Sequence, residues 1–443
     1  MGDYSDNFRF YSLRVFFIEK FRCFRSDHMK EVDIVVKNIS ELHTLQGPDR
    51  PRKGKEMRET GKIEDGGLAV RGDEIAVVGT TDEIEKEYKG KNEIDASGKT
   101  VIPGFVDPHT HLVFAGSREN ELVMKIEGKS YMEILEEGGG ILSTVRSTRR
   151  APKKELKDQS LKRLDNMIDN GTTTVEAKSG YGLDKENEIK SLEVIKELNE
   201  EHPVDLVSTY LGAHSLPPEH DESEGYIDFC IKEVLPEIIE RDLAEYCDVF
   251  CEKGVFSAEE SRRLLEVAKE SGLKPRVHAD EIENIGCSKM ASEIGAISAE
   301  HLVKTSERDI EKMAESGTIG ILLPGTPFML MDDEYSPARK MIEKGMALAL
   351  ATDLNPNCWT ESMQSVITLA CLQMKMTPSE TLTAATFNAA RALDREDVGI
   401  LQEGKKADFL ILDVPNHMHI PYRFGVNLVE KVYKSGQNID QTV

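Results

Sequence analysis

PGFVDPHTHL, at residues 103–112, separates two patterns of hydrophobic residues in this sequence. Before it, short runs rich in Val and Ile alternate with polar residues and are separated by Gly, Asp and Asn turns. This alternation predicts strands of a small antiparallel sheet. It returns near the other end of the chain, so we expect both ends to meet in one β-sandwich. The runs are residues 32–45, 66–79 and 93–107, and later 398–415 and 428–437.

After Val106 the pattern changes to buried apolar strands that alternate with amphipathic helices, such as those at 154–171 and 257–272. Counted with the strand that enters His109, there are eight strand candidates. This alternation predicts an α/β fold with a parallel sheet, and eight units close naturally into a (β/α)8 TIM barrel. The other candidates are residues 172–180, 204–214, 246–254, 274–281, 296–303, 318–325 and 346–356.

The two patterns divide the 443-residue chain into four expected segments. We expect residues 29–105 and 397–443 to form the β-sandwich and residues 106–396 to form the barrel. Residues 1–28 mix aromatic and basic side chains without the pattern of a secretory signal. We therefore interpret them as an N-terminal extension that is dispensable for folding.

Composition argues against several classes of partner. The formal net charge of −24, from 80 acidic and 56 basic residues, repels nucleic acid and anionic lipid. No apolar run approaches the ~18 to 20 residues that span a bilayer, so no membrane role is expected. The seven cysteines include no CxxC pair, which indicates reduced thiols in the cytoplasm. Cys247 and Cys251 are accordingly expected to be small buried hydrophobic side chains.

His109 and His111 lie two residues apart at the end of the first barrel strand. On an extended backbone both imidazoles point to the same side, where they can chelate one ion. A lone pair of this kind is more often structural than functional. The interpretation therefore depends on the polar residues that accompany it.

Further polar residues follow other predicted strands at their carboxyl ends, where barrel active sites form. His278 and Asp353 complete a set of three histidines and one carboxylate, which suits zinc or iron and leaves a position for water. From the residues alone, His214 and His301 are equally good candidates for a fifth ligand. These strand ends together predict one metal site.

The expected chemistry is hydrolysis. A metal ion lowers the pKa of bound water from ~15.7 toward ~7, so that hydroxide becomes available as the nucleophile. Glu281 follows His278 by three residues and can carry a proton from that water to a leaving nitrogen. The sequence therefore predicts a metal-dependent hydrolase that acts on C–N bonds.

The same motifs carry a family resemblance. PGFVDPHTHL, VHADE (277–281), SAEHL (298–302) and ATDLNP (351–356) resemble the single-metal branch of the amidohydrolase superfamily. FAGSRENEL (114–122), EAKSGYGL (176–183) and YLGAH (210–214) narrow the resemblance to the imidazolonepropionase family. It runs from about Met29 to the C-terminus. It implies that water opens the ring of 4-imidazolone-5-propanoate to give N-formimidoyl-L-glutamate in histidine degradation. It also implies a cytoplasmic homodimer with one Zn²⁺, Fe²⁺ or Fe³⁺ per subunit.

The resemblance also implies roles for individual residues. The metal ligands would be His109, His111, His278 and Asp353. The substrate contacts would come from Arg118, Tyr181, His214 and Glu281. Glu281 would move the proton, His301 would stabilise the oxyanion or orient water beside the scissile bond, and Asp353 would share the proton handling. Independently of the resemblance, the planar donor fork of Arg118 suits the propionate carboxylate.

One loop departs from the family pattern. Many relatives have Asn-Pro-Gly followed by a small hydroxyl residue, whereas this chain has Asn355, Pro356, Asn357 and Cys358. Asn355 is expected to contact the ligand, while Asn357 and Cys358 match by position only. Their side-chain contacts stay open, although backbone donors there can still serve.

Three other hypotheses remain. A carboxylated Lys178 would bridge two metal ions, as in hydantoinases or dihydroorotases, but Lys178 can instead pair with a carboxylate or help hold the propionate. A mononuclear deaminase of cytosine, guanine or a related ring would share the ligands and the glutamate, but a nucleobase has no carboxylate for Arg118. A catalytically inactive binding protein on the same barrel would not need the intact ligand set.

Overall fold

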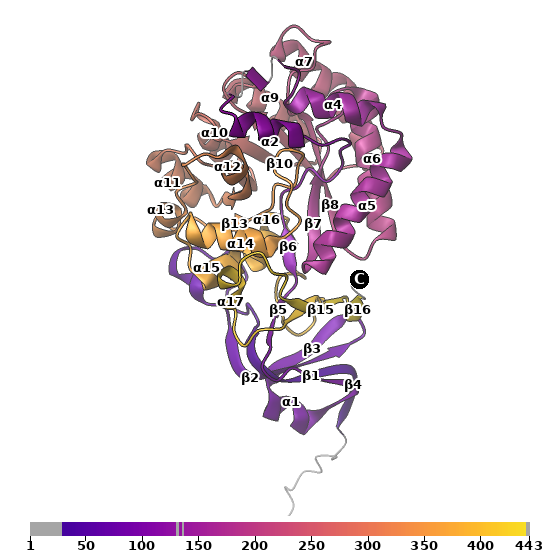
Figure 1. Cartoon of the computed structure of the whole chain (residues 1–443), viewed down its shortest axis with the longest axis vertical. Helices are drawn as coiled ribbons and strands as arrows, with labels where there is room; N and C mark the ends of the chain where they lie inside the picture. The colour runs from indigo at the N-terminus through magenta and orange to yellow at the C-terminus, as the bar shows by residue number, and fades with distance from the viewer. Residues whose placement is uncertain (1–28, 130–132, 135–136, 440–443) are drawn as a thin grey trace, which may run out of the picture.

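The computed structural model describes residues 29–129, 133–134 and 137–439. The expected N-terminal extension, residues 1–28, lies outside the described residues. Figure 1 shows a barrel of strands and helices above a sheet that contains segments from both ends of the chain. In the described ranges, no helix has both the length and the apolar character needed to cross a membrane.

The barrel sheet contains eight parallel strands that neighbour one another in chain order, from β6 to β13. Almost all of their residues are buried, which explains why the sequence shows apolar runs here instead of alternation. Each strand predicted after Val106 is present, so the predicted barrel is confirmed. The strands are β6 (Phe105–Asp107), β7 (Thr172–Lys178), β8 (Asp205–Ala213), β9 (Tyr246–Cys251), β10 (Lys274–Ala279), β11 (Ser298–His301), β12 (Ile319–Leu322) and β13 (Leu348–Leu350).

The barrel closes between its first and last strands, just beyond their carboxyl ends. The backbone N–H of Asp353 donates to the carbonyl of His109 at 3.1 Å, and the N–H of His111 donates to the carbonyl of Leu354 at 2.9 Å. The hydrogen bonds that close the barrel therefore also bring His109, His111 and Asp353 together.

Helices surround the barrel strands (Figure 1). The predicted helices at 154–171 and 257–272 correspond to α5 and α9, and α9 begins at a capping box between Ser257 and Glu260. The barrel helices are α2 (Glu119–Ile126), α4 (Ile141–Arg150), α5 (Lys153–Asp169), α6 (Lys185–Glu201), α7 (Ser223–Phe229), the π-helix η2 (Cys230–Val234), α8 (Leu235–Glu240), α9 (Ala258–Glu270), α10 (Cys287–Ile294), α11 (Glu307–Ser316), α12 (Gly325–Leu330), α13 (Ala338–Glu343), α14 (Met363–Leu372), α15 (Pro378–Ala385) and α16 (Phe387–Ala392).

A second eight-stranded sheet joins the two ends of the chain. Its link is the antiparallel pair β5–β14, in which Val101 lies opposite Ile411. Val101, Ile411 and Val36 belong to one hydrophobic cluster, so the two ends share a core. The elements are β1 (Lys30–His43), the 3-10 helix η1 (Gly54–Arg58), β2 (Lys62–Arg71), β3 (Glu74–Thr80), α1 (Thr81–Glu87), β4 (Tyr88–Asp95), β5 (Thr100–Pro103), β14 (Phe409–Leu412), α17 (His419–Tyr422), β15 (Val429–Lys434) and β16 (Gln437–Ile439).

The predicted fold class, a barrel with a small sandwich built from both ends of the chain, is confirmed. The predicted direction of the strands in this sheet was wrong in part. The sheet is mixed rather than antiparallel, because β1 pairs in parallel with β4 and with β5. Parallel neighbours need a crossover connection, and α1 lies between β3 and β4 in the chain. The alternation of residues indicates a half-buried strand but carries no information about its direction.

The expectation that the cysteines are reduced thiols was also wrong for one pair. Cys251 and Cys287 form a disulfide with a Cα–Cα distance of 5.8 Å, across 36 residues of sequence. Cys251 ends β9 and Cys287 begins α10, after the neighbouring strand β10. Only the adjacency of these two strands brings the sulfurs together, and cysteine spacing does not reveal it. Cys247 is a buried free thiol, as expected.

Glu380 in α15 pairs with Arg339 in α13, so it links these two helices. This pair provides a test of how stability depends on pH. Burial raises the pKa of its carboxyl, but hydrogen bonds from Arg339 and from the Thr377 N–H outweigh burial and lower the pKa from 4.5 to about 2. Glu380→Gln is therefore expected to destabilise the protein by about 1 to 2 kcal/mol at pH 7, after allowance for solvent screening. Because the folded pKa is depressed, this difference is full above pH 4.5 and disappears as the pH falls toward 2.

Urea unfolding of the wild type and the variant at pH 7, 5 and 3 measures this difference. Glu343→Gln is the matched control, since Glu343 is exposed and lies 3.9 Å from the same Arg339. A Glu380→Gln effect that stays constant from pH 7 to pH 3 would contradict an ionic origin.

Candidate metal centre and active site

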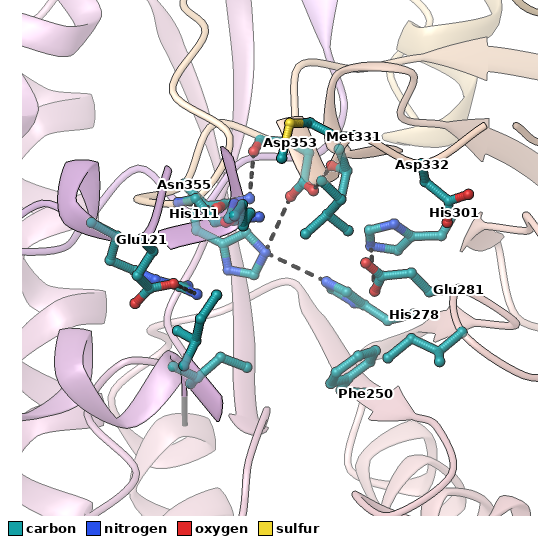
Figure 2. A pocket seen from close by; sticks show the side chains of 18 of the residues that line it. His111, Glu121, Phe250, His278, Glu281, His301, Met331, Asp332, Asp353 and Asn355 are labelled. Atoms are coloured by element: carbon teal, nitrogen blue, oxygen red, sulfur yellow. Dashed lines mark hydrogen bonds and ion pairs between the residues drawn. The ribbon is translucent and has the colours of Figure 1, made fainter. Parts of the chain in front are cut away.

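The carboxyl ends of the barrel strands surround a cavity of about 640 Å³. His111 follows β6, His214 follows β8, His278 lies in β10, and Asp353 follows β13. Figure 2 shows His111, His278 and Asp353 pointing toward one another, with Glu281 beside His301 across the cavity. The lining also includes apolar side chains, among them Phe250, Ile134, Ile141 and Ile282. A small molecule in this cavity would therefore meet polar groups on an otherwise apolar wall.

The four predicted metal ligands converge on one point. Asp353 Oδ1 lies 3.3 Å from His109 Nε2 and 3.5 Å from His111 Nε2. His111 Nε2 lies 3.5 Å from His278 Nε2. One nitrogen from each of the three histidines lies within 4.8 Å of the others. His301 also lies close to these ligands. Together with His109 and Asp353 it forms a second group of possible metal ligands.

The unpaired polar atoms of this cluster fit a metal ion. His109 Nε2 and Asp353 Oδ1 are buried and have no hydrogen-bond partner among the described residues. Buried polar atoms are rarely left without a partner unless a site has a ligand or a catalytic role. Three imidazole nitrogens and one carboxylate oxygen form a donor set suited to a borderline ion such as zinc or iron.

Two carboxylates behind the histidines fix which ring nitrogen faces the cluster. Glu300 Oε2 lies 2.5 Å from His109 Nδ1, and Asp248 Oδ2 lies 2.9 Å from His278 Nδ1. Metal-binding histidines commonly donate their second N–H to a carboxylate in this way. Thr326 in turn donates to the second carboxylate oxygen of Asp353 at 2.5 Å. The ligand atoms are therefore held in place by their neighbours.

Lys178 pairs with carboxylates beneath this cluster. Its Nζ lies 2.8 Å from Glu176 and from Asp248, and 3.3 Å from Glu300. Burial lowers the pKa of Lys178, but these three carboxylates outweigh burial and raise it. Carboxylation needs a neutral amine, whereas Lys178 is held as a cation. The geometry therefore favours the interpretation in which Lys178 pairs with carboxylates.

Glu281 and His301 lie side by side on one wall of the cavity. Glu281 Oε2 is 3.7 Å from His301 Nε2. Burial raises the pKa of the Glu281 carboxyl to about 8, and the charge of Asp353 adds to this effect. Burial also lowers the pKa of His301 to about 3. These shifts favour the protonated form of the Glu281 carboxyl and the neutral form of the His301 ring.

Tyr181 and His214 also line the cavity, next to His111. The His214 ring stacks on His111 with centroids 4.8 Å apart, and the Tyr181 ring lies 5.6 Å from the same histidine. His214 Nδ1 lies 2.9 Å from the carbonyl of Gly180, to which it donates, so Nε2 is left as an acceptor. Burial lowers the pKa of His214 to about 3, which keeps the ring neutral.

Arg118 lines the cavity but already has an acidic partner. Its Nη2 lies 2.6 Å from Glu121, and both side chains are almost fully buried. Glu121, three residues after Arg118, was not predicted as its partner. The Nε of Arg118 is buried and has no hydrogen-bond partner within the described part of the chain. Arg118 therefore keeps donors for an anionic ligand.

The loop after Asp353 places its three candidate residues differently. The Asn355 side chain accepts hydrogen bonds from the N–H groups of Asn357 and Cys358, at 2.8 and 3.0 Å. Asn355 and Asn357 line the cavity, and Asn357 accepts from Lys125 at 2.7 Å. Cys358 is buried, its sulfur faces the carbonyl of Thr352 at 3.7 Å, and it does not appear among the lining residues. A ligand contact from its side chain stays a prediction.

Backbone strain also concentrates at this site. His301 and Asp353 have φ values of 67° and 52°, in the left-handed region that residues with a side chain rarely adopt. Asp280 and Leu302, next to Glu281 and His301, have φ values of 55° and 59°. Strained residues are typical of active sites, where the surrounding structure holds them in place.

The buried residues that support the ligands were not predicted from the sequence. They are Asp107, Glu176, Asp248, Arg276, Glu300 and Thr326. Arg276 donates from Nε to Glu300 at 2.8 Å, and both side chains are fully buried. Asp107 accepts from Thr352 Oγ1 at 2.5 Å. The available signal was a charged residue inside an apolar strand, such as Asp248 in YCDVFC (246–251). Buried charges need partners, so each charged residue of this set indicates a network.

Comparisons with known proteins identify the family of this chain. A family model described as the amidohydrolase family matches residues 100–439. The imidazolonepropionase of Alkaliphilus metalliredigens (strain QYMF) is 55% identical over 411 residues, which cover 92% of this chain and 97% of the relative. The imidazolonepropionase of Geobacillus kaustophilus (strain HTA426) is 49% identical over 413 residues, which cover 91% and 97%.

Solved structures with low sequence identity share the fold. An adenosine deaminase from Xanthomonas campestris has a TM-score of 0.70 at 16% identity and covers 93% of each chain. The ochratoxinase of A. niger has a TM-score of 0.66 at 18% identity, covering 92% of this chain and 96% of that one. These values support the architecture alone, whereas the two bacterial relatives match nearly the whole chain at about half of all positions. The chain therefore belongs to the amidohydrolase family and, within it, to the imidazolonepropionases.

Proposed function

We propose that this chain hydrolyses 4-imidazolone-5-propanoate to N-formimidoyl-L-glutamate. Its family is metal-dependent and acts on C–N bonds of cyclic amides. One observation carries the proposal beyond family membership: a cluster suited to a metal ion and a glutamate with a raised pKa share a cavity with a buried arginine that keeps an unpaired donor. A ring with a carboxylate side chain matches all three groups.

His109, His111, His278 and Asp353 would hold one Zn²⁺, Fe²⁺ or Fe³⁺ per subunit. When bound, such an ion acts as a Lewis acid on the ring carbonyl and lowers the pKa of water. Through their contacts with the Nδ1 atoms, the carboxylates of Glu300 and Asp248 would leave the Nε2 atoms of His109 and His278 available to hold the ion.

Glu281 would move the proton in this reaction. Hydrolysis transfers a proton from water to the ring nitrogen that leaves, and a carboxyl with a pKa near neutral can both accept and donate it. The neutral His301 beside it would donate a hydrogen bond to the developing oxyanion or orient the attacking water. Asp353 would share the proton handling at the ring.

Other lining residues would position the substrate. Arg118 would bind the propionate carboxylate with the donors that Glu121 leaves free. Tyr181 would approach the ligand from the turn at 179–182, and the Nε2 of His214 would accept a hydrogen bond from a ring N–H. Asn355 and Asn357 would contact the glutamate-like part of the product, and the N–H of Cys358 would hold the Asn355 side chain in place.

Replacement of Arg118 provides a specificity test. Arg118→Ala is expected to lower kcat/KM for imidazolonepropionate by about 10- to 100-fold, mainly through KM, because a charge-assisted hydrogen bond contributes about 1.5–3 kcal/mol. Arg118→Lys keeps the charge but not the fork, so it should recover only part of the loss. Steady-state kinetics measure both variants against Arg146→Ala, an exposed arginine outside the lining. An unchanged KM in Arg118→Ala would remove its assigned role.

The remaining expectations concern the cellular form of the enzyme. It would work as a cytoplasmic homodimer on this small molecule and would bind neither nucleic acid nor membrane. Residues 29–105 and 397–443 would form one domain and residues 106–396 the other, with residues 1–28 dispensable for folding.

The deciding experiment incubates the purified protein with freshly prepared imidazolonepropionate and follows the loss of its ultraviolet absorbance. Guanine and cytosine serve as controls for the deaminase hypothesis, with release of ammonia as the readout. Turnover of imidazolonepropionate alone supports the proposal. Ammonia from either base, with no loss of imidazolonepropionate, would replace it with deamination, and no turnover of any of them would favour a binding protein.

A further inference from the structure

A second group of possible metal ligands lies outside the active site. Glu41 and His43 lie near the end of β1, and His417 lies two residues before α17. In Figure 1, α17 and α15 lie at the end of the barrel next to the terminal sheet, where β5 leads into β6. The catalytic cavity is built from the carboxyl ends of the barrel strands instead, and none of these three residues lines it.

Alternation along β1 brings the first two ligands together. Glu41 and His43 are two residues apart, so their side chains leave the strand on the same side. Glu41 Oε2 lies 3.0 Å from His43 Nε2 and 3.0 Å from His417 Nδ1. The two imidazole rings have centroids 4.4 Å apart at an angle of 61°, so both approach the same oxygen.

These separations are close to those of a tetrahedral zinc site. With zinc–nitrogen and zinc–oxygen bonds of ~2.0–2.1 Å, neighbouring ligand atoms lie about 3.3 Å apart. Each observed nitrogen–oxygen separation is 3.0 Å, and all three ligand atoms lie within 4.8 Å of one another. An outward movement of a few tenths of an ångström would admit the ion.

The outer ring nitrogens also have the partners that a metal site needs. His43 Nδ1 lies 2.8 Å from Thr60 Oγ1, and His417 Nε2 lies 3.1 Å from Ser379 Oγ. Hydroxyls both donate and accept, so each ring can move its proton to the outer nitrogen without losing a hydrogen bond. This change of tautomer keeps both protons on the rings, frees the two inner nitrogens to bind one cation, and leaves the outer contacts intact.

The neighbouring charges permit a cation at this position. His43 is fully buried, while the side chains of His417 and Glu41 are 11% and 14% exposed, which leaves room for water as a fourth ligand. Lys62 lies 3.6 Å from the other oxygen of Glu41, but its side chain is 41% exposed and also pairs with Glu64 at 2.8 Å. Lys62 can therefore turn toward Glu64 when an ion binds.

We propose that Glu41, His43 and His417 bind a second transition-metal ion, zinc by the preference of this donor set, at a site distinct from the catalytic centre. The ion joins β1 to the segment before α17. Because His417 forms a hydrogen bond with Ser379, the ion is also linked to α15. It ties the two ends of the chain to the barrel and takes no part in ring opening. Its effect is on stability, because a ligand that binds only the folded chain stabilises it.

Metal counting tests the proposal on the full chain. The protein is stripped with a chelator, reloaded with Zn²⁺ alone, desalted and analysed by mass spectrometry of the metal. The wild type is expected to retain two zinc ions per chain, and His417→Gln and Glu41→Gln are each expected to retain one. The control His419→Gln, two residues along the same segment and outside the ligand group, should retain two.

A second measurement separates this site from the catalytic one. In a chain that carries His109→Asn and Asp353→Asn, Zn²⁺ should still raise Tm by roughly 2–4 °C, and the addition of His417→Gln should abolish that rise. One zinc ion in the wild type, two in both His417→Gln and Glu41→Gln, or a Tm rise that survives His417→Gln would each overturn the proposal. None of these results depends on turnover of imidazolonepropionate, so the proposed reaction can fail or succeed independently.

Discussion

His109→Asn is expected to lose the catalytic metal ion and at least about 10³-fold in kcat. His109 lies at the centre of the cluster, with Asp353 Oδ1 at 3.3 Å on one side and Glu300 Oε2 at 2.5 Å on the other. Asparagine has a shorter side chain than histidine, so its nitrogen cannot reach the position of His109 Nε2. Its amide can still donate a hydrogen bond to Glu300, so the carboxylate keeps a partner. Without the ion, water in the cavity keeps its ordinary pKa of ~15.7 and is a poor nucleophile.

Metal analysis and single-turnover kinetics measure this effect together. His202→Gln is the matched control, because His202 pairs with Asp165 at 3.3 Å and belongs to no group of possible metal ligands among the described residues. Full metal content in His109→Asn would remove it from the ligand set. Full turnover in a protein that has lost its metal would show that the ion does not take part in the reaction.

Much of the barrel could be predicted from the sequence because its signals are local. Apolar runs such as 318–325 alternate with amphipathic helices, and almost all residues of the strands in these runs are buried. The ligands were predictable for a related reason. Parallel strands of a barrel end at one rim, so polar residues that follow separate strands, such as His278 and Asp353, must come close together.

The features that could not be predicted depend on contacts between strands that are far apart in the sequence. Asp248, Lys178 and Glu300 belong to three different strands, and each is recognisable only as an isolated charge in an apolar run. The disulfide of Cys251 and Cys287 could not be predicted for the same reason. Neither pairing has a fixed spacing along the chain, so both appear only when the order of the strands is known.

The ligand group at the end of β1 shows the same limit. ELH at residues 41–43 has the spacing of HTH at 109–111, and it carries one histidine and one carboxylate. Its third member, His417, is 376 residues from Glu41 and follows the last strand of the antiparallel pair that joins the chain ends. The short motif was visible, but its completion required the closure of the terminal sheet.

Glu281→Gln is expected to lower kcat by about 10²- to 10⁴-fold while the metal content stays unchanged. Glutamine keeps the size of the side chain and its contact with His301 but cannot accept or release a proton. Burial raises the pKa of Glu281 to about 8, so the ionisation of this carboxyl falls within the range of ordinary assays. The wild-type rate should therefore depend on pH through this group, and a positive ion nearby shifts that pKa downward.

The variant should lose this ionisation from its pH–rate profile, which a merely structural defect would not do. Glu283→Gln is the matched control, because Glu283 lies two residues further along the same loop, is exposed and pairs with Lys253 at 2.6 Å. Near wild-type turnover in Glu281→Gln would exclude it as the proton carrier. Loss of metal from that variant would instead place Glu281 among the ligands, because a group that only transfers protons can be replaced without releasing the ion.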